Sequence, residues 1–418
     1  MTTLSRILVL SILSIILTFT SCSSNDDGGT IPEPFSIKTA AELNAYLDDM
    51  AKATDVPGFA ISVVKGNSIV YQESFGYANI QNQVAYTNTT INSIASTSKT
   101  FVGAAVAKAI EQGHFTLETD INDLLPISIT NPKQPEGIIR IKHLVTHTSG
   151  LLDRPEVYLA YNYHILPGEN INTAGAGILM NEIGIEQREG YSLEDFLAAY
   201  FLEDGDLYSL DNFADTPPGS TWAYSNLATG LTGYIIETVT GQSFDEYVKE
   251  NILLPLQMNA SSYNFSEINT DEMATRYVNN NTPLPIYAND SYPEGGLYTS
   301  NEDMGKYLLD MVNGIKGESS LLFSEEAYEM LFDPQLADGL VPLDFAENQG
   351  LFWYFKDGKA IHGGNSFGVS THLEIEQNGA SGFIFMSNMD ASFSGNTQNY
   401  LAVQEKVSKA IKEYLAAN

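Results

Sequence analysis

The sequence predicts one α+β domain, in which both ends of the chain form a single antiparallel sheet flanked by helices, with a mainly helical region inserted between them. Three observations lead to this prediction. Residues 59–75 and 351–386 are rich in β-branched and aromatic residues and contain tight-turn signals, which is typical of hairpins. Apolar residues at helical spacing dominate the region between them. No internal repeat and no Pro/Gly-rich linker interrupts the chain after residue 36.

Local signals assign the elements in order. Before the insertion they are a helix with a capping box at Thr39, strands at 59–65 and 68–75 joined by a turn at Gly66-Asn67, and a buried helix from Phe101 to Gln112. The insertion, residues 151–216, is polar and rich in tyrosine, and contains a helix capped by Ser192. It either walls the functional site or packs against the domain. After it come helices at 226–240 and from Ser300, strands at 351–355, 359–361, 369–376 and 381–386, and a C-terminal amphipathic helix.

The composition favours a folded, acidic protein. Hydrophobic residues make up 43% of the 418 residues, which is enough for a substantial core. The formal net charge is −32, whereas a nucleic-acid-binding surface needs a basic face. We therefore expect no nucleic-acid partner and attribute the charge to a solvated surface.

The N-terminus predicts export. Residues 1–21 have the layout of a signal peptide, with a basic residue before an apolar stretch that is too short for a membrane span. Thr20-Ser21-Cys22 resembles the lipobox of bacterial lipoproteins, which implies lipidation at Cys22 and anchoring to the outer membrane, facing the periplasm or the medium. Residues 22–36 form a polar tether to a domain over residues 37–418. The alternative is a cleaved signal peptide with an incidental cysteine.

Ser96 and Lys99 stand where the buried helix begins. A spacing of three residues places both side chains on one face of a helix. An amine beside a serine hydroxyl is one way to activate this weak nucleophile. The S-x-x-K pattern also occurs by chance, so its interpretation depends on partners elsewhere in the chain.

Two further motifs supply such partners. Tyr224-Ser225-Asn226 opens a predicted helix, and its tyrosine can shuttle protons if a cation such as Lys99 lowers its pKa far below about 10. His362-Gly363-Gly364-Asn365 ends a predicted strand, where backbone without side chains lets a substrate lie along the strand edge and an N–H helps to form an oxyanion hole. The alternatives are a packed tyrosine, and a glycine turn beside a structural histidine.

Taken together, the motifs resemble those of the serine β-lactamase and penicillin-binding-protein superfamily. Tyr-x-Asn and His-x-Gly are similar to the class C β-lactamase-related branch, which includes D-alanyl-D-alanine carboxypeptidases, D-aminopeptidases and esterases. The resemblance runs from about residue 40 to the C-terminal helix and includes the segments 141–151, 255–258 and 295–300. It implies the β-lactamase/transpeptidase-like fold.

The resemblance also implies a role for each motif. Ser96 would be the acylated nucleophile, and Lys99 and Tyr224 the proton-transfer pair. Asn226 would position a substrate amide, and His362 would lie near the substrate carboxylate. The strand edge and the oxyanion hole would be formed by Gly363, Gly364, Asn365 and the backbone N–H of Ser96. The resemblance implies no cofactor and no metal.

Two other patterns offer competing sites. Gly364-Asn365-Ser366-Phe367-Gly368 matches the G-x-S-x-G nucleophile elbow, but that motif needs a helix after the turn, and residues 369–376 predict a strand. His143 and His147 have the spacing of a zinc pair, but the glutamate of H-E-x-x-H and a third ligand are missing.

The implied function is a serine hydrolase that forms an acyl-enzyme at Ser96 and acts on D-amino-acid peptides, amides or esters, similar to D-alanyl-D-alanine carboxypeptidases. His362 stands where β-lactamases usually have lysine, and a histidine with a pKa near 6.5 is only partly charged at neutral pH, so efficient β-lactam hydrolysis is less expected. The alternatives are a carboxylesterase or weak β-lactamase of the same fold, and a non-catalytic penicillin- or peptidoglycan-binding receptor. The expected partners are a small-molecule or peptide substrate and, through the lipid anchor, the membrane. The sequence makes no prediction about oligomeric state.

Overall fold

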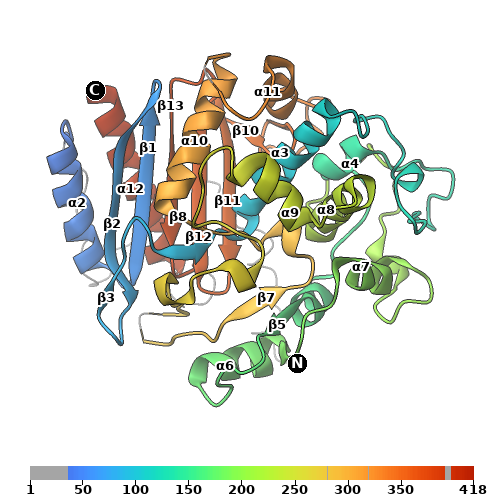
Figure 1. Cartoon of the computed structure of the whole chain (residues 1–418), viewed down its shortest axis with the longest axis horizontal. Coiled ribbons are helices and arrows are strands. Elements are labelled where there is room, and N and C mark those ends of the chain that lie inside the picture. The colour runs from blue at the N-terminus through green and yellow to red at the C-terminus, as the bar shows by residue number, and fades with distance from the viewer. Residues whose placement is uncertain (1–35, 280, 319, 391–396) are drawn as a thin grey trace.

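A computed structural model describes residues 36–418 except 280, 319 and 391–396 (Figure 1). Its centre is an eight-stranded sheet in the order β3-β2-β1-β13-β12-β11-β10-β9, and the neighbouring strands are antiparallel. The strands are β1 (Gly58–Lys65), β2 (Ser68–Asn79), β3 (Val84–Ala85), β9 (Asn348–Gln349), β10 (Tyr354–Lys356), β11 (Lys359–Ser366), β12 (Val369–Glu376) and β13 (Ser381–Ser387).

Strand β1 pairs with β13, so the first and last strands of the sheet by sequence lie side by side at its centre. The predicted turn at Gly66-Asn67 is confirmed, because Lys65 pairs with Ser68 across it. Lys356 pairs with Lys359 in the same way across Asp357-Gly358. The predicted strand at 359–361 is too short, because β11 continues to Ser366 and turns directly into β12. The α+β prediction, with both chain ends in one antiparallel sheet, is confirmed.

Helices cover both faces of the sheet. They are α2 (Ala40–Ala53), α3 (Ser98–Glu111), α4 (Ile141–Val145), α5 (Pro155–Val157), α6 (Ala174–Ile178), α7 (Leu193–Phe201), α8 (Asn226–Thr240), α9 (Phe244–Val248), α10 (Asn301–Ile315), α11 (Glu325–Phe332) and α12 (Thr397–Ala417). Successive side chains of a strand point to opposite faces. In β1, Phe59, Ile61 and Val63 therefore join α2 and α12 in one core, whereas Ser62 bonds to Asn301 of α10 on the other face. The sequence of a strand that is covered on both faces is typically a continuous run of apolar residues.

Three predicted helix starts and ends match the structure closely. Thr39 and Glu42 form the expected capping box at α2. Helix α8 spans Asn226–Thr240 as predicted, and Ser300 caps α10. The sequence signals were local hydrogen-bonding side chains, which depend little on distant contacts.

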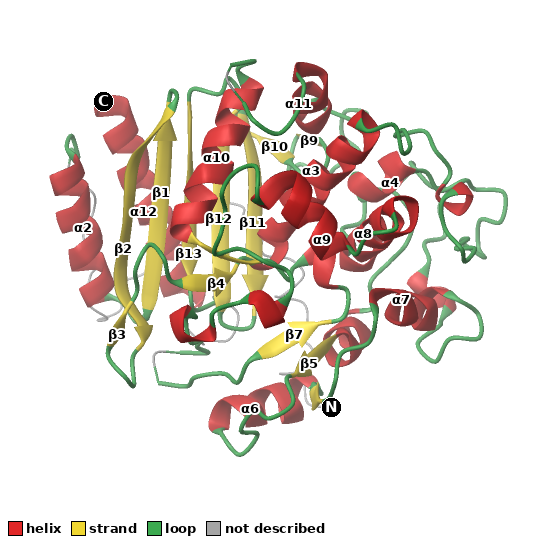
Figure 2. Cartoon of the chain, in the orientation of Figure 1, coloured by secondary structure: helices red, strands yellow, loops and turns green. Residues whose placement is uncertain are grey.

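The insertion is more structured than predicted. Besides α7, whose cap Ser192 is confirmed, it contains α5, α6 and the short strands β5 (Tyr163–Ile165) and β6 (Glu186–Gln187). Strand β5 pairs with β7 (Tyr287–Asn289), which ties the insertion to the segment before β8 (Tyr298–Ser300). Figure 2 shows α6, α7, β5 and β7 away from the main sheet. Strand β8 pairs in turn with β4 (Ile91–Ser93), close to Ser96.

The predicted signal peptide, Cys22 and most of the tether lie outside the described residues. Among the helices of the described part, none is long and apolar enough to cross a membrane.

Candidate active site

Ser96 lies in a tight 3₁₀ turn, η1 (Ala95–Thr97), immediately before α3. The sequence predicted it in the first turn of the helix itself. Neighbouring elements hold this turn, because the Ile94 N–H donates to Leu297 O at 3.1 Å and the Thr371 hydroxyl donates to Ile94 O at 3.0 Å. Ala95 has a φ of +46°, a conformation that a non-glycine residue adopts at a cost of about 1–3 kcal/mol. Ser96 is only partly buried, whereas the rest of residues 91–100 is buried.

Lys99 is fully buried, and its ammonium joins residues from three parts of the chain. Its Nζ donates to Ser96 Oγ at 3.2 Å and to Asn226 Oδ1 at 2.8 Å. It also donates to Glu294, at 2.8 Å to the carbonyl oxygen and 3.0 Å to Oε2. The Tyr224 hydroxyl donates to Ser96 Oγ at 3.0 Å. The structure thus brings together Ser96, Lys99, Tyr224 and Asn226, which are up to 130 positions apart in sequence.

The pKa of Tyr224 is not lowered, as a proton-shuttling tyrosine would need, but raised. Burial raises the pKa of Tyr224, and the opposing effect of Lys99 is smaller, so the phenol keeps its proton at neutral pH. Burial by itself would lower the pKa of Lys99, but Tyr224 and the Glu294 carboxylate raise it above its ordinary value. The expected depressed tyrosine pKa is therefore wrong. Two protonated donors face Ser96 Oγ in the resting site, and one of them has to lose its proton before it can accept the proton of Ser96.

Sequence reasoning missed two carboxylates. Glu294 ends a short turn, η9 (Tyr292–Glu294), and pairs with Lys99 although both side chains are almost completely buried. Asp153, at the start of the insertion, accepts hydrogen bonds from the Asn226 N–H at 2.7 Å and from Asn226 Nδ2 at 3.0 Å. Glu294 directly precedes the segment 295–300, and Asp153 follows the segment 141–151, so the family-like segments were the available signal.

Strand β11 packs against the turn that holds Ser96. A Cβ atom on Gly364 would lie 2.3 Å from Ile94 O and 3.0 Å from Thr97 N, so only glycine permits this contact. At Gly363 the nearest atom to such a Cβ is 3.8 Å away. Pairs alternate along an antiparallel ladder, and Ser366 and Val369 flank a two-residue turn, so the N–H of Asn365 points away from β12.

That open edge can receive a substrate. In the described part of the chain β10 pairs with β11 only over residues 359–361, which leaves residues 362–366 without a partner strand on the edge opposite β12. N–H groups in the first turn of a helix lack a partner inside the helix, and Ser96 lies in such a turn. The predicted oxyanion donors, the Ser96 and Asn365 N–H groups, thus belong to two segments in direct contact.

His362 does not match the expectation of partial charge. Its side chain is 1% exposed, its ring lies 4.9 Å from that of Tyr354, and its Nδ1 contacts Gly363 O at 2.8 Å. Burial, and then the positive charge of Lys99, lower the pKa of His362 to about 3. The imidazole is therefore neutral at physiological pH and does not attract a substrate carboxylate by charge.

The structure argues against both competing sites. Ser366 is followed by the strand β12, so it does not lie on a nucleophile elbow, and its Oγ contacts the Tyr287 hydroxyl at 3.0 Å. His143 and His147 use their Nδ1 atoms to accept the N–H groups of Arg140 and Ser225. No cluster of three or more metal-ligating side chains occurs among the described residues.

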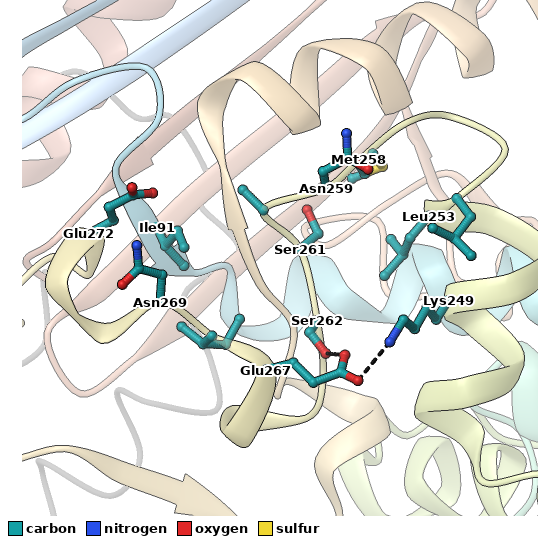
Figure 3. A pocket seen from close by; sticks show the side chains of 13 residues that line it. Ile91, Lys249, Leu253, Met258, Asn259, Ser261, Ser262, Glu267, Asn269 and Glu272 are labelled. Carbon is teal, nitrogen blue, oxygen red and sulfur yellow. Dashed lines mark hydrogen bonds and ion pairs between the residues drawn. The ribbon is translucent and has the colours of Figure 1, made fainter.

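A separate cavity of about 440 Å³ lies beside β4 (Figure 3). Lys249 and Glu267 form an ion pair of 2.6 Å in its lining, and Ile91 contributes from β4. Ser96, Lys99 and Tyr224 do not line this cavity. The nucleophile site is therefore distinct from it.

Two proteins with different names, one of them an esterase, are similar to this chain in sequence. Protein flp of Staphylococcus aureus is 23% identical over 276 residues, which cover 65% of this chain and 48% of that protein. Esterase EstB of Burkholderia gladioli is 28% identical over 278 residues, which cover 63% of this chain and 62% of the esterase. The chain thus matches about half the length of the staphylococcal protein.

Solved structures share the fold. A penicillin-binding protein homologue from Pyrococcus abyssi superimposes with a TM-score of 0.67 at 22% identity, covering 89% of this chain and 80% of its own. A β-lactamase/D-alanine carboxypeptidase from Yersinia pestis superimposes with a TM-score of 0.59 at 19% identity, covering 84% of this chain and 93% of its own. Residues 43–406 match the model of the β-lactamase family. With this coverage and this fold, the chain belongs to the β-lactamase family of the β-lactamase/transpeptidase-like serine hydrolase superfamily.

Proposed function

We propose that the protein is a serine hydrolase that forms an acyl-enzyme at Ser96 and acts on D-amino-acid peptides, amides or esters, in the manner of a D-alanyl-D-alanine carboxypeptidase. One observation carries the proposal. Ser96 is partly exposed, and its Oγ lies within hydrogen-bond distance of both Lys99 Nζ, at 3.2 Å, and the Tyr224 hydroxyl, at 3.0 Å. An accessible serine with two proton-transfer groups is the arrangement that nucleophilic catalysis needs.

In the proposed reaction, Ser96 Oγ bonds to the substrate carbonyl carbon while its proton passes to the deprotonated member of the Lys99–Tyr224 pair. The oxygen that becomes negative accepts hydrogen bonds from the Ser96 and Asn365 N–H groups. The bond to the leaving group then breaks, and the pair returns the proton to the leaving nitrogen or oxygen. In deacylation, a water molecule passes a proton to the deprotonated member of the pair and attacks the acyl carbonyl carbon. The bond to Ser96 Oγ then breaks, and the proton returns to Ser96. Because the resting pair is fully protonated, acylation is expected to speed up as pH rises above neutrality.

The surroundings of Asn226 support an amide substrate. Its Oδ1 accepts from Lys99, and one hydrogen of its Nδ2 is donated to Asp153. A side-chain amide has two N–H donors, so one remains to bind a substrate carbonyl. Asn226 is thereby held in one orientation by charged groups on both sides.

A carboxylesterase is the second candidate, because the neutral His362 adds no charge that would hold a carboxylate. The similarity to esterase EstB agrees with this alternative. A third possibility, a receptor that is acylated without turnover, predicts a stable acyl-enzyme. The N-terminal signal and Cys22 would place any of these activities on a membrane-anchored lipoprotein.

The test is a substrate panel of D-Ala-D-Ala peptides, p-nitrophenyl esters and nitrocefin, with wild type and Ser96→Ala side by side. We expect Ser96→Ala to lower turnover by a factor of about 10³ or more and to abolish labelling by a fluorophosphonate probe. Ser366→Ala removes the competing serine of the G-x-S-x-G pattern and should retain labelling by the probe. Unchanged labelling and hydrolysis in Ser96→Ala would overturn the proposal. Acylation seen by intact mass without product release would instead favour the receptor.

A further inference from the structure

The insertion reaches the candidate site through Tyr158. This residue starts a single helical turn, η3 (Tyr158–Asn162), and its side chain is 3% exposed. Its hydroxyl donates to Glu294 Oε1 at 2.5 Å. Asn289 Nδ2, on β7, donates to the same oxygen at 3.0 Å. The other oxygen, Oε2, accepts from Lys99 at 3.0 Å.

This arrangement leaves the Glu294 carboxylate little freedom. Two neutral donors hold Oε1, and Oε2 is left to face the ammonium of Lys99. Burial of a carboxylate costs free energy unless each oxygen accepts a hydrogen bond or faces a cation. The loss of a donor to Glu294 therefore changes the relative stability of the charged and neutral forms of Lys99. Asn289 is only five positions from Glu294, whereas Tyr158 is 136 positions away, so the Tyr158 contact is a product of the tertiary fold.

We propose that Tyr158 is a positioning residue for Lys99, which acts by holding the Glu294 carboxylate against the ammonium. The proposal rests on the proposed function, in which Lys99 and Tyr224 transfer the proton of Ser96. The insertion would then have a chemical task, because Tyr158 in η3 influences the charge of Lys99 beside the nucleophile.

The electrostatic surroundings of Lys99 determine the direction of the effect. Glu294 is the carboxylate bonded to Lys99, and the neutral phenol of Tyr224 lies on another side, with the ring centroid 5.1 Å from Nζ. The buried imidazoles of His147 and His362 are neutral at physiological pH, because burial lowers their pKa values. Other titratable groups near Glu294 itself are Tyr158, Tyr163, Tyr263 and Asp153.

The sign follows from the two protonation states. The Tyr158 hydroxyl stabilises the Glu294 carboxylate most when Lys99 is neutral, because the negative charge then has no cation beside it. Without this donor the neutral state of Lys99 is harder to reach, so the active form requires a higher pH. Removal of the Glu294 charge has the opposite effect, since this carboxylate then no longer opposes the effect of burial, which lowers the pKa of Lys99.

The experiment measures the rate of fluorophosphonate labelling at Ser96 from about pH 5 to pH 10 in the full chain. We expect Tyr158→Phe to move the rising limb of the pH profile to higher pH by about one unit. Glu294→Gln is expected to move it to lower pH. A purely structural contact would lower the rate at all pH values and leave the limb in place.

Tyr247→Phe is the matched control, because it removes another buried hydroxyl, one that donates to Gln112 at the far end of α3. Its limb should coincide with that of the wild type. A Tyr158→Phe limb at the wild-type pH, or one that moves in the same direction as that of Glu294→Gln, overturns the inference. If Tyr158→Phe does not fold, Asn289→Leu removes the second donor to the same oxygen, and its limb should also move to higher pH.

The same data separate this inference from the proposed function. Labelling that persists in Ser96→Ala overturns the proposed function and the inference with it. Labelling that depends on Ser96, together with an unchanged limb in Tyr158→Phe, overturns the inference alone.

Discussion

Lys99 and His362 respond to burial in opposite ways. Both side chains are almost fully enclosed, and both have a charged form that burial disfavours. Glu294 offsets this cost for Lys99 and keeps the ammonium. His362 makes no ion pair with a carboxylate among the described residues and lies near the positive Lys99, so it stays neutral. The partners of each side chain therefore decide which of two neighbouring basic residues carries charge.

His362→Lys tests the consequence for substrate choice. A lysine adds a positive charge close to the open edge of β11 and should favour substrates that carry a carboxylate. We expect the ratio of acylation rates, for a carboxylate-bearing β-lactam over a neutral p-nitrophenyl ester, to rise about fivefold, equivalent to about 1 kcal/mol. His362→Gln keeps the site neutral and should leave the ratio near that of the wild type. An unchanged ratio in His362→Lys would show that this position does not meet the substrate carboxylate.

At the scale of elements, close backbone approaches position the candidate site. Helix α8 lies against η9, where a Cβ on Gly233 would be 2.4 Å from Pro293 Cγ. A Cβ on Gly230 would likewise lie 2.9 Å from Ser291 Cβ, next to the turn that carries Glu294. Strand β11 approaches η1 in the same way through Gly364. These contacts connect the strand, the nucleophile turn and the lysine partner.

Gly364→Ala tests the approach of β11 to η1. The added Cβ would overlap Ile94 O, a backbone atom that cannot rotate away, so the strand or the turn has to move. We expect a loss of about 1–3 kcal/mol in the free energy of unfolding, measured by denaturant titration. Displacement of Ser96 is expected to lower acylation about a hundredfold. Gly363→Ala, where the nearest atom is 3.8 Å away, is the control for stability and should keep the wild-type midpoint.

At the scale of the whole molecule, burial of neutral histidines links folding to pH. In the folded chain, His147 and His362 remain neutral at pH values where an exposed histidine would bind a proton. The unfolded chain therefore binds more protons below about pH 6.5, and stability falls as pH falls. For His362 this loss continues down to the folded-state pKa of about 3.

We therefore expect the free energy of unfolding to decrease by about 1.4 kcal/mol per pH unit for each such histidine below pH 6.5. Denaturant midpoints at about pH 7 and pH 5 measure this decrease. His362→Gln removes one titrating group and should make the decrease shallower by that amount. Parallel loss of stability in wild type and variant would contradict the neutral, buried state of His362.

Much of the fold was accessible from the sequence because its signals are local. Turn dipeptides such as Gly66-Asn67, the cap at Thr39 and the apolar run after Ser96 specify elements over a few residues each. The insertion was less accessible, since its short strands pair with distant partners such as β7 and have little pattern of their own. Strand β11 was predicted too short, because its glycines weaken the strand signal while tertiary contact with η1 requires them.

The candidate site, like the fold, could be predicted only in part from the sequence. The identities and order of Ser96, Lys99, Tyr224 and Asn226 were evident from short motifs, because spacing along a helix start and the family-like pattern are properties of the chain itself. Their charge states were not, and Glu294, Asp153 and Tyr158 were missed altogether. Protonation depends on burial and on partners brought together from distant segments, and only the folded chain has either.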